Sequence, residues 1–292
     1  MNSVLQDLVN LLDLEPLELN LFRGHSLDLG GKSVYGGQVI GQALVAASRT
    51  VEDAVPHSLH AYFLRRGDMD RPIVYEVERV RDGRSFTARV VQAIQNGEPI
   101  LTMMASFQRP ERGLEHQAQM PQVPPPESLR PQTELMREWL DADGSLPPDR
   151  REALLRPMAL DFRPVQPRNP LAPDPRPPQQ NFWFRVTGTL PDDPLLHACM
   201  LAYASDFSLM STSLLPHRMS YLMPGVAVAS IDHAVWFHRP VRVDDWLLYS
   251  MDSPTAQGMR GMSRGLIFNR AGELVASAAQ EGLMRPARGS QV

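Results

Sequence analysis

Prolines are distributed unevenly along this chain, and their distribution limits where regular structure can form. Fifteen of the 27 prolines lie between Pro121 and Pro178. Because proline has a fixed φ and no backbone donor, this stretch cannot be mostly helix or sheet. Only residues 134–140 and 150–155 have the spacing of short helices, and we expect extended chain over 164–178. We therefore predict a proline-rich linker between two blocks of similar size, with boundaries at 1–118, 119–180 and 181–292.

The N-terminal block changes from helical to strand-like patterning. Residues 3–6 fit a capping box before a helix that carries apolar residues over 4–12. Gly36-Gly37-Gln38 begins a run that is apolar and small on nearly every side, which is typical of a buried helix. Asp82-Gly83 and Asn96-Gly97 predict turns. The block is thus predicted to be one buried helix followed by an antiparallel meander, with strands over 57–65, 73–80, 84–95 and 99–108.

The C-terminal block repeats this order, with a helix predicted over 195–209 and strands over 226–237, 246–252, 259–268 and 274–284. The segment from His60 to Arg66 aligns with that from His233 to Arg239, and Asn96-Gly97-Glu98 aligns with Ala271-Gly272-Glu273. The spacing between the two anchors differs by only two residues. Self-similarity at half the chain length predicts a duplicated α+β fold. The expected architecture is a double hotdog, in which two tandem repeats each wrap an antiparallel sheet around a long helix and the sheets join edge to edge.

Composition and missing motifs exclude several functions. With 29 Lys and Arg against 33 Asp and Glu, the net charge of −4 disfavours nucleic-acid binding. The single cysteine, Cys199, excludes an internal disulfide and a zinc site built on paired cysteines. No apolar stretch is long enough to span a membrane, so we expect a cytoplasmic protein. Gly24-His25-Ser26 lacks the second glycine of a serine hydrolase elbow, and no nucleotide or His-Glu-x-x-His motif is present. We therefore expect no metal and no cofactor.

Three polar residues stand in apolar surroundings. Asp206 follows Leu201-Ala202-Tyr203-Ala204-Ser205, Ser230 follows a run of valine and alanine, and Gln280 follows Ala278-Ala279. Each has an ordinary structural interpretation: a helix end for Asp206, a local hydrogen bond for Ser230 and a solvent-facing strand position for Gln280. Taken singly, none of the three defines a site.

Several ordered segments resemble the acyl-CoA thioesterase II (TesB-like) family. They include Tyr35-Gly36-Gly37-Gln38, Arg81-Asp82-Gly83-Arg84-Ser85-Phe86, Tyr203-Ala204-Ser205-Asp206, Ile231-Asp232-His233 and Gln280-Glu281-Gly282. The resemblance implies a double hotdog fold and hydrolysis of acyl-CoA thioesters to free acid and coenzyme A. It also implies a catalytic set of Asp, Thr or Ser, and Gln, which falls here on Asp206, Ser230 and Gln280. The middle position is more familiar as threonine, and serine keeps its hydroxyl.

The residue types suggest a mechanism for this set. A carboxylate, a hydroxyl and an amide can hold one water against a thioester carbonyl, with Asp206 as general base and no metal or covalent intermediate. The backbone N–H groups of Gly36 and Gly37 are candidate oxyanion donors, although tight helix packing also explains these glycines. Candidate partners for the coenzyme A phosphates are Arg65, Arg66 and Arg239, although strand-end arginines are more often simply solvated.

We therefore expect a hydrolase of fatty acyl-CoA of medium to long chain length, assembled as a homodimer or larger homo-oligomer. One alternative is an enoyl-CoA hydratase of the hotdog type, which would need Asp232 and His233 to act together although strand alternation separates them. Another is a non-catalytic acyl-CoA-binding or regulatory protein on the same fold. His60 and His233 occupy matched repeat positions, which favours a structural role for both.

Overall fold

The computed structural model describes residues 2–29, 31 and 33–287, and its strands form one antiparallel sheet. The first repeat contributes β1 (Glu15–Glu18), β2 (Leu21–Gly24), β3 (Val55–Phe63), β4 (Ile73–Asp82), β5 (Phe86–Gln95) and β6 (Glu98–Gln108). The second contributes β7 (Leu160–Pro164), β8 (Gln179–Val186), β9 (Ala227–Ser230), β10 (Asp232–Phe237), β11 (Leu247–Gln257), β12 (Arg260–Asn269) and β13 (Leu274–Arg285).

The strand order has the symmetry of a duplication. It runs β1-β2-β4-β5-β6-β3 and then β10-β13-β12-β11-β8-β7, with β9 also paired to β13. The two halves therefore meet where β3 pairs with β10, in a register that places Tyr62 opposite Asp232 and Ser58 opposite Trp236. This edge-to-edge junction, predicted from the repeat, leaves neither β3 nor β10 with an unpaired edge.

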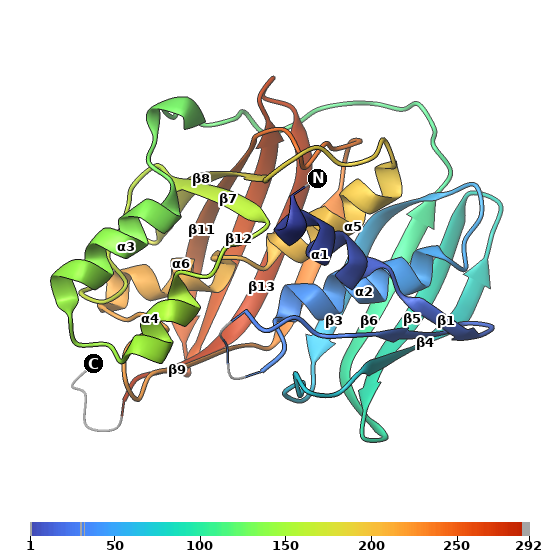
Figure 1. Cartoon of the computed structure of the whole chain (residues 1–292). Helices are drawn as coiled ribbons and strands as arrows, with labels where there is room; N and C mark the ends of the chain where they lie inside the picture. The colour runs from blue at the N-terminus through green and yellow to red at the C-terminus, as the bar shows by residue number, and fades with distance from the viewer. Residues whose placement is uncertain (1, 30, 32, 288–292) are drawn as a thin grey trace.

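Two helices, α2 (Gly36–Ser48) and α5 (Pro194–Ser205), lie in the hollow of the curved sheet (Figure 1). They run antiparallel, because Gly37 packs on the Tyr203 carbonyl while Gly41 packs on the Cys199 carbonyl. A side chain at either glycine would hold the two helices apart. The start of α2 consequently lies against the end of α5.

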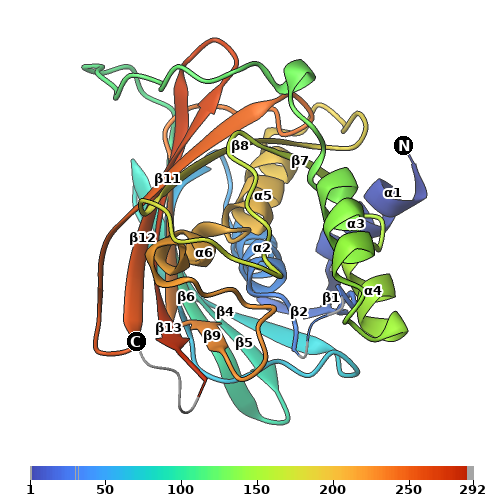
Figure 2. The same cartoon turned by 90° about the vertical axis from the view of Figure 1, so that its left-hand side faces the viewer.

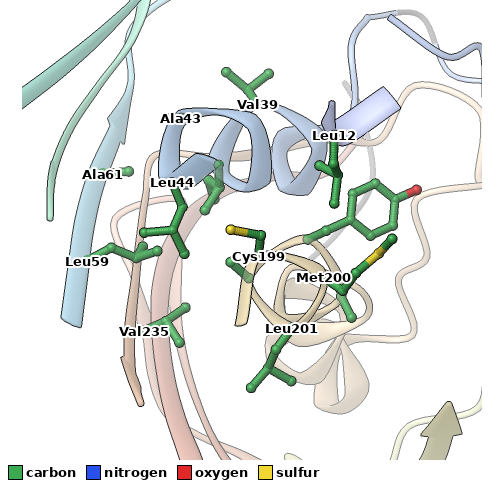
Figure 3. Close-up of a cluster of buried hydrophobic side chains, with 14 of the residues drawn as sticks. Leu12, Val39, Ala43, Leu44, Leu59, Ala61, Cys199, Met200, Leu201 and Val235 are labelled. Atoms are coloured by element: carbon green, nitrogen blue, oxygen red, sulfur yellow. The ribbon is translucent and has the colours of Figure 1, made fainter. Parts of the chain in front are cut away.

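The core fills the space between these helices and the central strands. Figure 3 shows Leu44 of α2, Leu59 of β3 and Val235 of β10 directed toward one another. All three are fully buried, and each such burial stabilises the fold by about 1.5–3 kcal/mol. The helix predicted to be buried on nearly every side is confirmed, since eleven residues of α2 are buried.

The remaining helices lie around α2 and α5. They are α1 (Ser3–Leu12), α3 (Gln132–Asp143), α4 (Pro148–Leu154), α6 (Leu209–Leu214) and the short 3-10 turns η1 (Pro126–Ser128) and η2 (Leu215–His217). The buried leucines of α1 extend the same core. Figure 2 shows α1, α3 and α4 on the side of α2 and α5 that faces away from the sheet. None of the helices in the described ranges is both long and apolar enough to cross a membrane.

The proline-rich segment contains more structure than a connector. The two short helices predicted there are present as α3 and α4, but β7 within the segment was not predicted and pairs with β8 at the edge of the sheet. The chain therefore joins the second half of the sheet at Leu160, and β8 begins at Gln179. The division at residues 118 and 180 stays a prediction.

Two local predictions at chain ends and turns were wrong in detail. Asn2, not Ser3, caps α1, because its side chain accepts a hydrogen bond from the Leu5 N–H. The loop after Asp82 is longer than the predicted two residues, since β5 begins only at Phe86. The turn at Asn96-Gly97 is confirmed: both residues have positive φ, at 54° and 76°, as a tight hairpin requires.

Candidate active site

The end of α5 places Asp206. The helix predicted over 195–209 stops at Ser205, where Asp206 becomes the C-cap, and the chain resumes as α6 after Ser208 adopts a left-handed φ of 61°. Asp206 is therefore not part of a continuous helix, and its carboxylate is partly exposed at the junction with α2. Its Oδ2 accepts a hydrogen bond from the Gly37 N–H at 2.9 Å.

Gln280 joins Asp206 to Ser230. From its position in β13, the Gln280 Nε2 donates to Asp206 Oδ1 at 2.7 Å and to Ser230 Oγ at 2.6 Å. Gln280 is only 1% exposed, so it is not the solvent-facing strand residue of the alternative interpretation. Ser230 is partly exposed at the end of β9. The structure thus brings the three predicted residues together from three separate elements, while their catalytic roles stay a prediction.

The strand predicted over 226–237 is divided into β9 and β10. Ser230 lies opposite Gly282, whereas Ala234 lies opposite Ala279, so four steps along one chain match three along the other. This extra residue is a β-bulge, which kinks a strand and redirects its side chains. The bulge falls immediately after Ser230.

The two glycines at the start of α2 bind the Asp206 carboxylate and leave room for it. No side chain caps α2 from its own N-cap residue, Tyr35, and Asp206 takes that place. A Cβ on Gly36 would lie 2.8 Å from Asp206 Oδ2, so only glycine allows this approach. Because the Gly37 N–H already binds Asp206, it positions the carboxylate here, and Gly36 N–H is the remaining candidate oxyanion donor.

Two buried tyrosines, Tyr203 and Tyr249, and the partly buried Tyr35 surround the end of α5. Burial, and after it the charge of Asp206, raises the pKa of Tyr35, Tyr203 and Tyr249, so all three remain protonated donors. Tyr35 Oη donates to the Tyr203 carbonyl at 3.0 Å, and Tyr249 Oη donates to the Ser205 carbonyl at 2.9 Å. These bonds fix the backbone that carries Asp206. This role was not predicted from the sequence, where the position of Tyr35 before Gly36-Gly37 was the one available signal.

The equivalence assigned to His60 and His233 was wrong. His60 is exposed on the outer face of β3, whereas His233 is 1% exposed and its Nε2 lies 2.8 Å from Ser205 Oγ. Burial is the main cause that lowers the pKa of His233, so the ring is neutral near pH 7. The shared sequence pattern therefore hides two different environments.

The three arginines do not form one cluster. Arg65 and Arg66 follow β3 at the end near the site, where the Gly67 carbonyl accepts from the Val34 N–H two residues before α2. Arg65 pairs with Glu98 at 2.6 Å, and Arg66 is exposed. Arg239 instead donates to the Leu274 carbonyl at 3.0 Å. Leu274 is six residues along β13 from Gln280, which is about 20 Å at the rise of a strand.

The described residues contain no cluster of metal-ligating side chains. Within residues 2–29, 31 and 33–287, no group of three or more His, Cys, Asp or Glu side chains is placed to hold a metal ion. The carboxylate, amide and hydroxyl at the end of α5 already bond to one another and to backbone.

Comparison with known proteins identifies the family. Residues 157–283 match the model of the family described as acyl-CoA thioesterase, and residues 25–108 match that of the acyl-CoA thioesterase N-terminal domain. The chain is 42% identical to acyl-CoA thioesterase 2 of Haemophilus influenzae over 98% of its own length and 99% of the relative. It is 44% identical to the acyl-CoA thioesterase II TesB2 of Mycobacterium marinum, with a TM-score of 0.78 over 97% of this chain and 98% of that one.

A more distant structure confirms the fold. The hot dog protein of unknown function from Alicyclobacillus acidocaldarius is 20% identical, with a TM-score of 0.75 over 95% of this chain and 97% of its own. With one such helix and sheet in each half, the architecture is the α+β double hotdog predicted from the repeat. The full-length similarity in sequence shows more than the fold: the chain belongs to the acyl-CoA thioesterase family.

Proposed function

We propose that this chain hydrolyses fatty acyl-CoA of medium to long chain length to free fatty acid and coenzyme A, by direct attack of water and without a covalent intermediate. The observation that carries the proposal is the Gln280 amide, which bonds at once to the Asp206 carboxylate and the Ser230 hydroxyl. A carboxylate, an amide and a hydroxyl that share hydrogen bonds at a partly exposed position form a cradle for one water.

The chemistry follows from what each group can do. A water between Asp206 and Ser230 attacks the thioester carbon while Asp206 takes its proton, a step that a positioned general base accelerates by about 10²–10⁴-fold. The tetrahedral intermediate then expels the coenzyme A thiolate, which receives the proton from Asp206. Gln280 cannot titrate, so its role is to hold the other two groups. The Gly36 N–H, at the positive end of α2, is our candidate donor to the oxyanion.

An apolar cleft next to the site supports an aliphatic substrate. It lies between α1, the loop after β2 and the start of β7, and Tyr203, one helical turn before Asp206, is part of its wall. Its other lining residues include Val4, Leu8, Leu27, Met158 and Leu160. The cavity has a volume of about 20 Å³, room for about one water, so we propose that the acyl chain contacts this apolar lining once α1 and the loop after β2 move apart. Arg65 and Arg66, at the same end of the sheet, are the arginines we propose for coenzyme A phosphates.

We further propose that the protein acts in cytoplasmic lipid metabolism as a homodimer or larger homo-oligomer. The outer face of the central strands supports self-association, because large apolar side chains remain exposed there. Tyr62 is 59% exposed, Met104 47% and Trp236 36%. Residues of this type in the middle of an outer face favour contact with a second copy.

Thiol release from acyl-CoAs of graded chain length tests the activity. We expect Asp206→Asn and Gln280→Ala to lower turnover by at least about 100-fold while the fold survives. Asp252→Asn is a matched control, because Asp252 pairs with Arg264 on the surface of β11 and β12. Full turnover in Asp206→Asn would refute the assignment of the base.

The same assay separates the two alternatives. Binding of acyl-CoA without thiol release would identify a non-catalytic binding protein. For a hydratase, Asp232 and His233 would need to meet, but Asp232 Oδ1 accepts from the Glu281 N–H at 2.6 Å while His233 is buried on the opposite face. That arrangement favours the hydrolase.

A further inference from the structure

The β-bulge between β9 and β10 turns two side chains to the same face of the sheet. Along a regular strand, residues three apart point to opposite faces. The extra residue lets Ser230 and His233 both face the helices. It is held in place because the Ile231 N–H donates to the Glu281 carbonyl at 2.9 Å, and the Asp232 side chain accepts from the Glu281 N–H.

The register beyond the bulge sets His233 against Gln280. Ala234 lies opposite Ala279 and Val235 opposite Ala278, so the next pair in the same register is His233 and Gln280. Both side chains are 1% exposed. Opposed residues on one face have Cβ atoms about 4.5–5.5 Å apart, within reach of a side-chain hydrogen bond. Gln280 is also among the groups that act on the pKa of His233.

Each member of this pair has one buried polar atom with no hydrogen-bond partner among the described residues. These atoms are His233 Nδ1 and Gln280 Oε1. The Gln280 Nε2 directs its two donors to Asp206 and Ser230, so its Oε1 can only accept. The structure records no hydrogen bond between these two atoms, but His233 is the residue opposite Gln280 in register, so we assign a protonated Nδ1 as the donor to Oε1.

We propose that His233 is a positioning residue of the hydrolytic site: its neutral ring, protonated on Nδ1, donates to Gln280 Oε1 and fixes the amide with Nε2 toward Asp206 and Ser230. In the reversed amide orientation, Oε1 would face the Asp206 carboxylate, and two acceptors would oppose each other. The Ser205 hydroxyl donates to the Ala202 carbonyl at 2.8 Å and also lies 2.8 Å from His233 Nε2. The proposed tautomer requires its single hydrogen to turn from that carbonyl to the ring nitrogen.

Two substitutions separate the two sides of the ring. In His233→Asn, the amide nitrogen replaces Nδ1 and retains a donor to Gln280. In His233→Gln, the longer side chain replaces Nε2 and retains the contact with Ser205, but Gln280 loses its donor. We expect His233→Asn to keep kcat within about tenfold of wild type and His233→Gln to lower kcat by about 100-fold with little change in KM. Equal losses, or the reverse order, would overturn the proposal.

His238 supplies the matched control. Its Nε2 also lies 2.8 Å from a serine hydroxyl, that of Ser277, and burial is the main cause that lowers its pKa, but it lies at the far end of β10 from the site. His238→Asn and His238→Gln should leave kcat unchanged. His238 is exposed, so it matches His233 in its bond to a serine and not in burial. A loss in either variant that equals the loss in His233→Gln would show that the effect belongs to any serine-bonded histidine of this sheet, and would overturn the proposal.

A spectroscopic measurement tests the tautomer without relying on turnover. In wild-type protein labelled with ¹⁵N-histidine, the His233 ring should show a protonated Nδ1 and an unprotonated Nε2 near pH 7. Ser205→Ala, which removes the contact to Nε2, identifies the resonance. A ring protonated on Nε2 would overturn the proposal even if both His233 variants fail to fold. The inference rests on the proposed function only for its kinetic readout: absence of thiol release by wild type would contradict that function and leave the tautomer test valid.

Discussion

Substitution of Gly37 by alanine tests how closely the site depends on the contact between α2 and α5. A Cβ at this position would overlap the Tyr203 carbonyl oxygen and would lie 2.5 Å from Tyr35 Cε1. Contacts shorter than 3.0 Å are not tolerated, so the neighbouring groups must move by at least about 0.5 Å. The Gly37 N–H that holds Asp206 Oδ2 is on the residue that is displaced.

Two costs follow from this displacement. Overpacking of a tight contact destabilises a fold by about 1–3 kcal/mol. A weakened hydrogen bond to a charged group adds about 1.5–3 kcal/mol at most. Since the two effects overlap, we expect Gly37→Ala to lower the free energy of unfolding by about 2–4 kcal/mol. Displacement of a catalytic base by a fraction of an ångström to 1 Å lowers the rate by up to about 100-fold, so we expect kcat to fall by about that factor.

Gly41→Ala is the internal control, one turn further along the same helix pair. Its Cβ would lie 3.2 Å from Leu12 Cδ2 and 3.3 Å from the Cys199 carbonyl oxygen, so a movement of a few tenths of an ångström accommodates it. We expect it to keep kcat within about threefold, because it does not touch Asp206. Urea unfolding and thiol release measure both variants. Wild-type kcat in folded Gly37→Ala would refute the positioning role of this contact.

Three further predictions concern the hydroxyl, the phosphate contacts and pH. Ser230→Thr should retain at least wild-type kcat, because threonine keeps the hydroxyl and restricts its rotation, whereas a tenfold loss would show that the site has no room for the added methyl. Arg66→Ala should raise KM for acyl-CoA severalfold while Arg239→Ala should not, and the opposite order would refute our choice of arginines. Because burial lowers the pKa of folded His233 below the ordinary 6.5, its contribution to stability is complete above that pH and is lost as pH falls toward the folded pKa. Urea unfolding at pH 7 and 5.5 gives the change in the free energy of unfolding with pH. This change should be smaller in His233→Gln than in wild type by up to about 1.4 kcal/mol per pH unit, and equal changes would contradict the prediction.

The main strands, the buried helix and the duplication were predictable because their signals are local. Alternating apolar residues and the Asn96-Gly97 turn predicted the antiparallel meander, and the internal repeat predicted two copies of the fold. The short strands β1, β2, β7 and β8 were not predicted. Their patterning is weak because much of their stability comes from pairing with a sheet that is already formed.

The site residues were predicted through the family resemblance, whereas their geometry was not. The interruption of the helix after Ser205 and the bulge after Ser230 each depend on one residue and carry no periodic signal. Both arise from tertiary contacts, namely the bond of Gly37 to Asp206 and the bond of Glu281 to Asp232. Because the bulge is not visible in the sequence, the alignment of the repeats placed His60 and His233 in the same environment. In the structure they face opposite sides of the sheet.

The antiparallel contact of α2 and α5 creates two junctions where a helix start meets a helix end, and they have diverged. At one, α2 has no cap of its own and receives Asp206 from the other repeat. At the other, Asp193 caps α5 within its own repeat, and Arg49 ends α2. Two separate identical subunits would have to equip both junctions alike. In the fused chain the two junctions carry different residues, and an isolated second half would keep Asp206, Ser230 and Gln280 but lose the Gly37 N–H that holds the carboxylate.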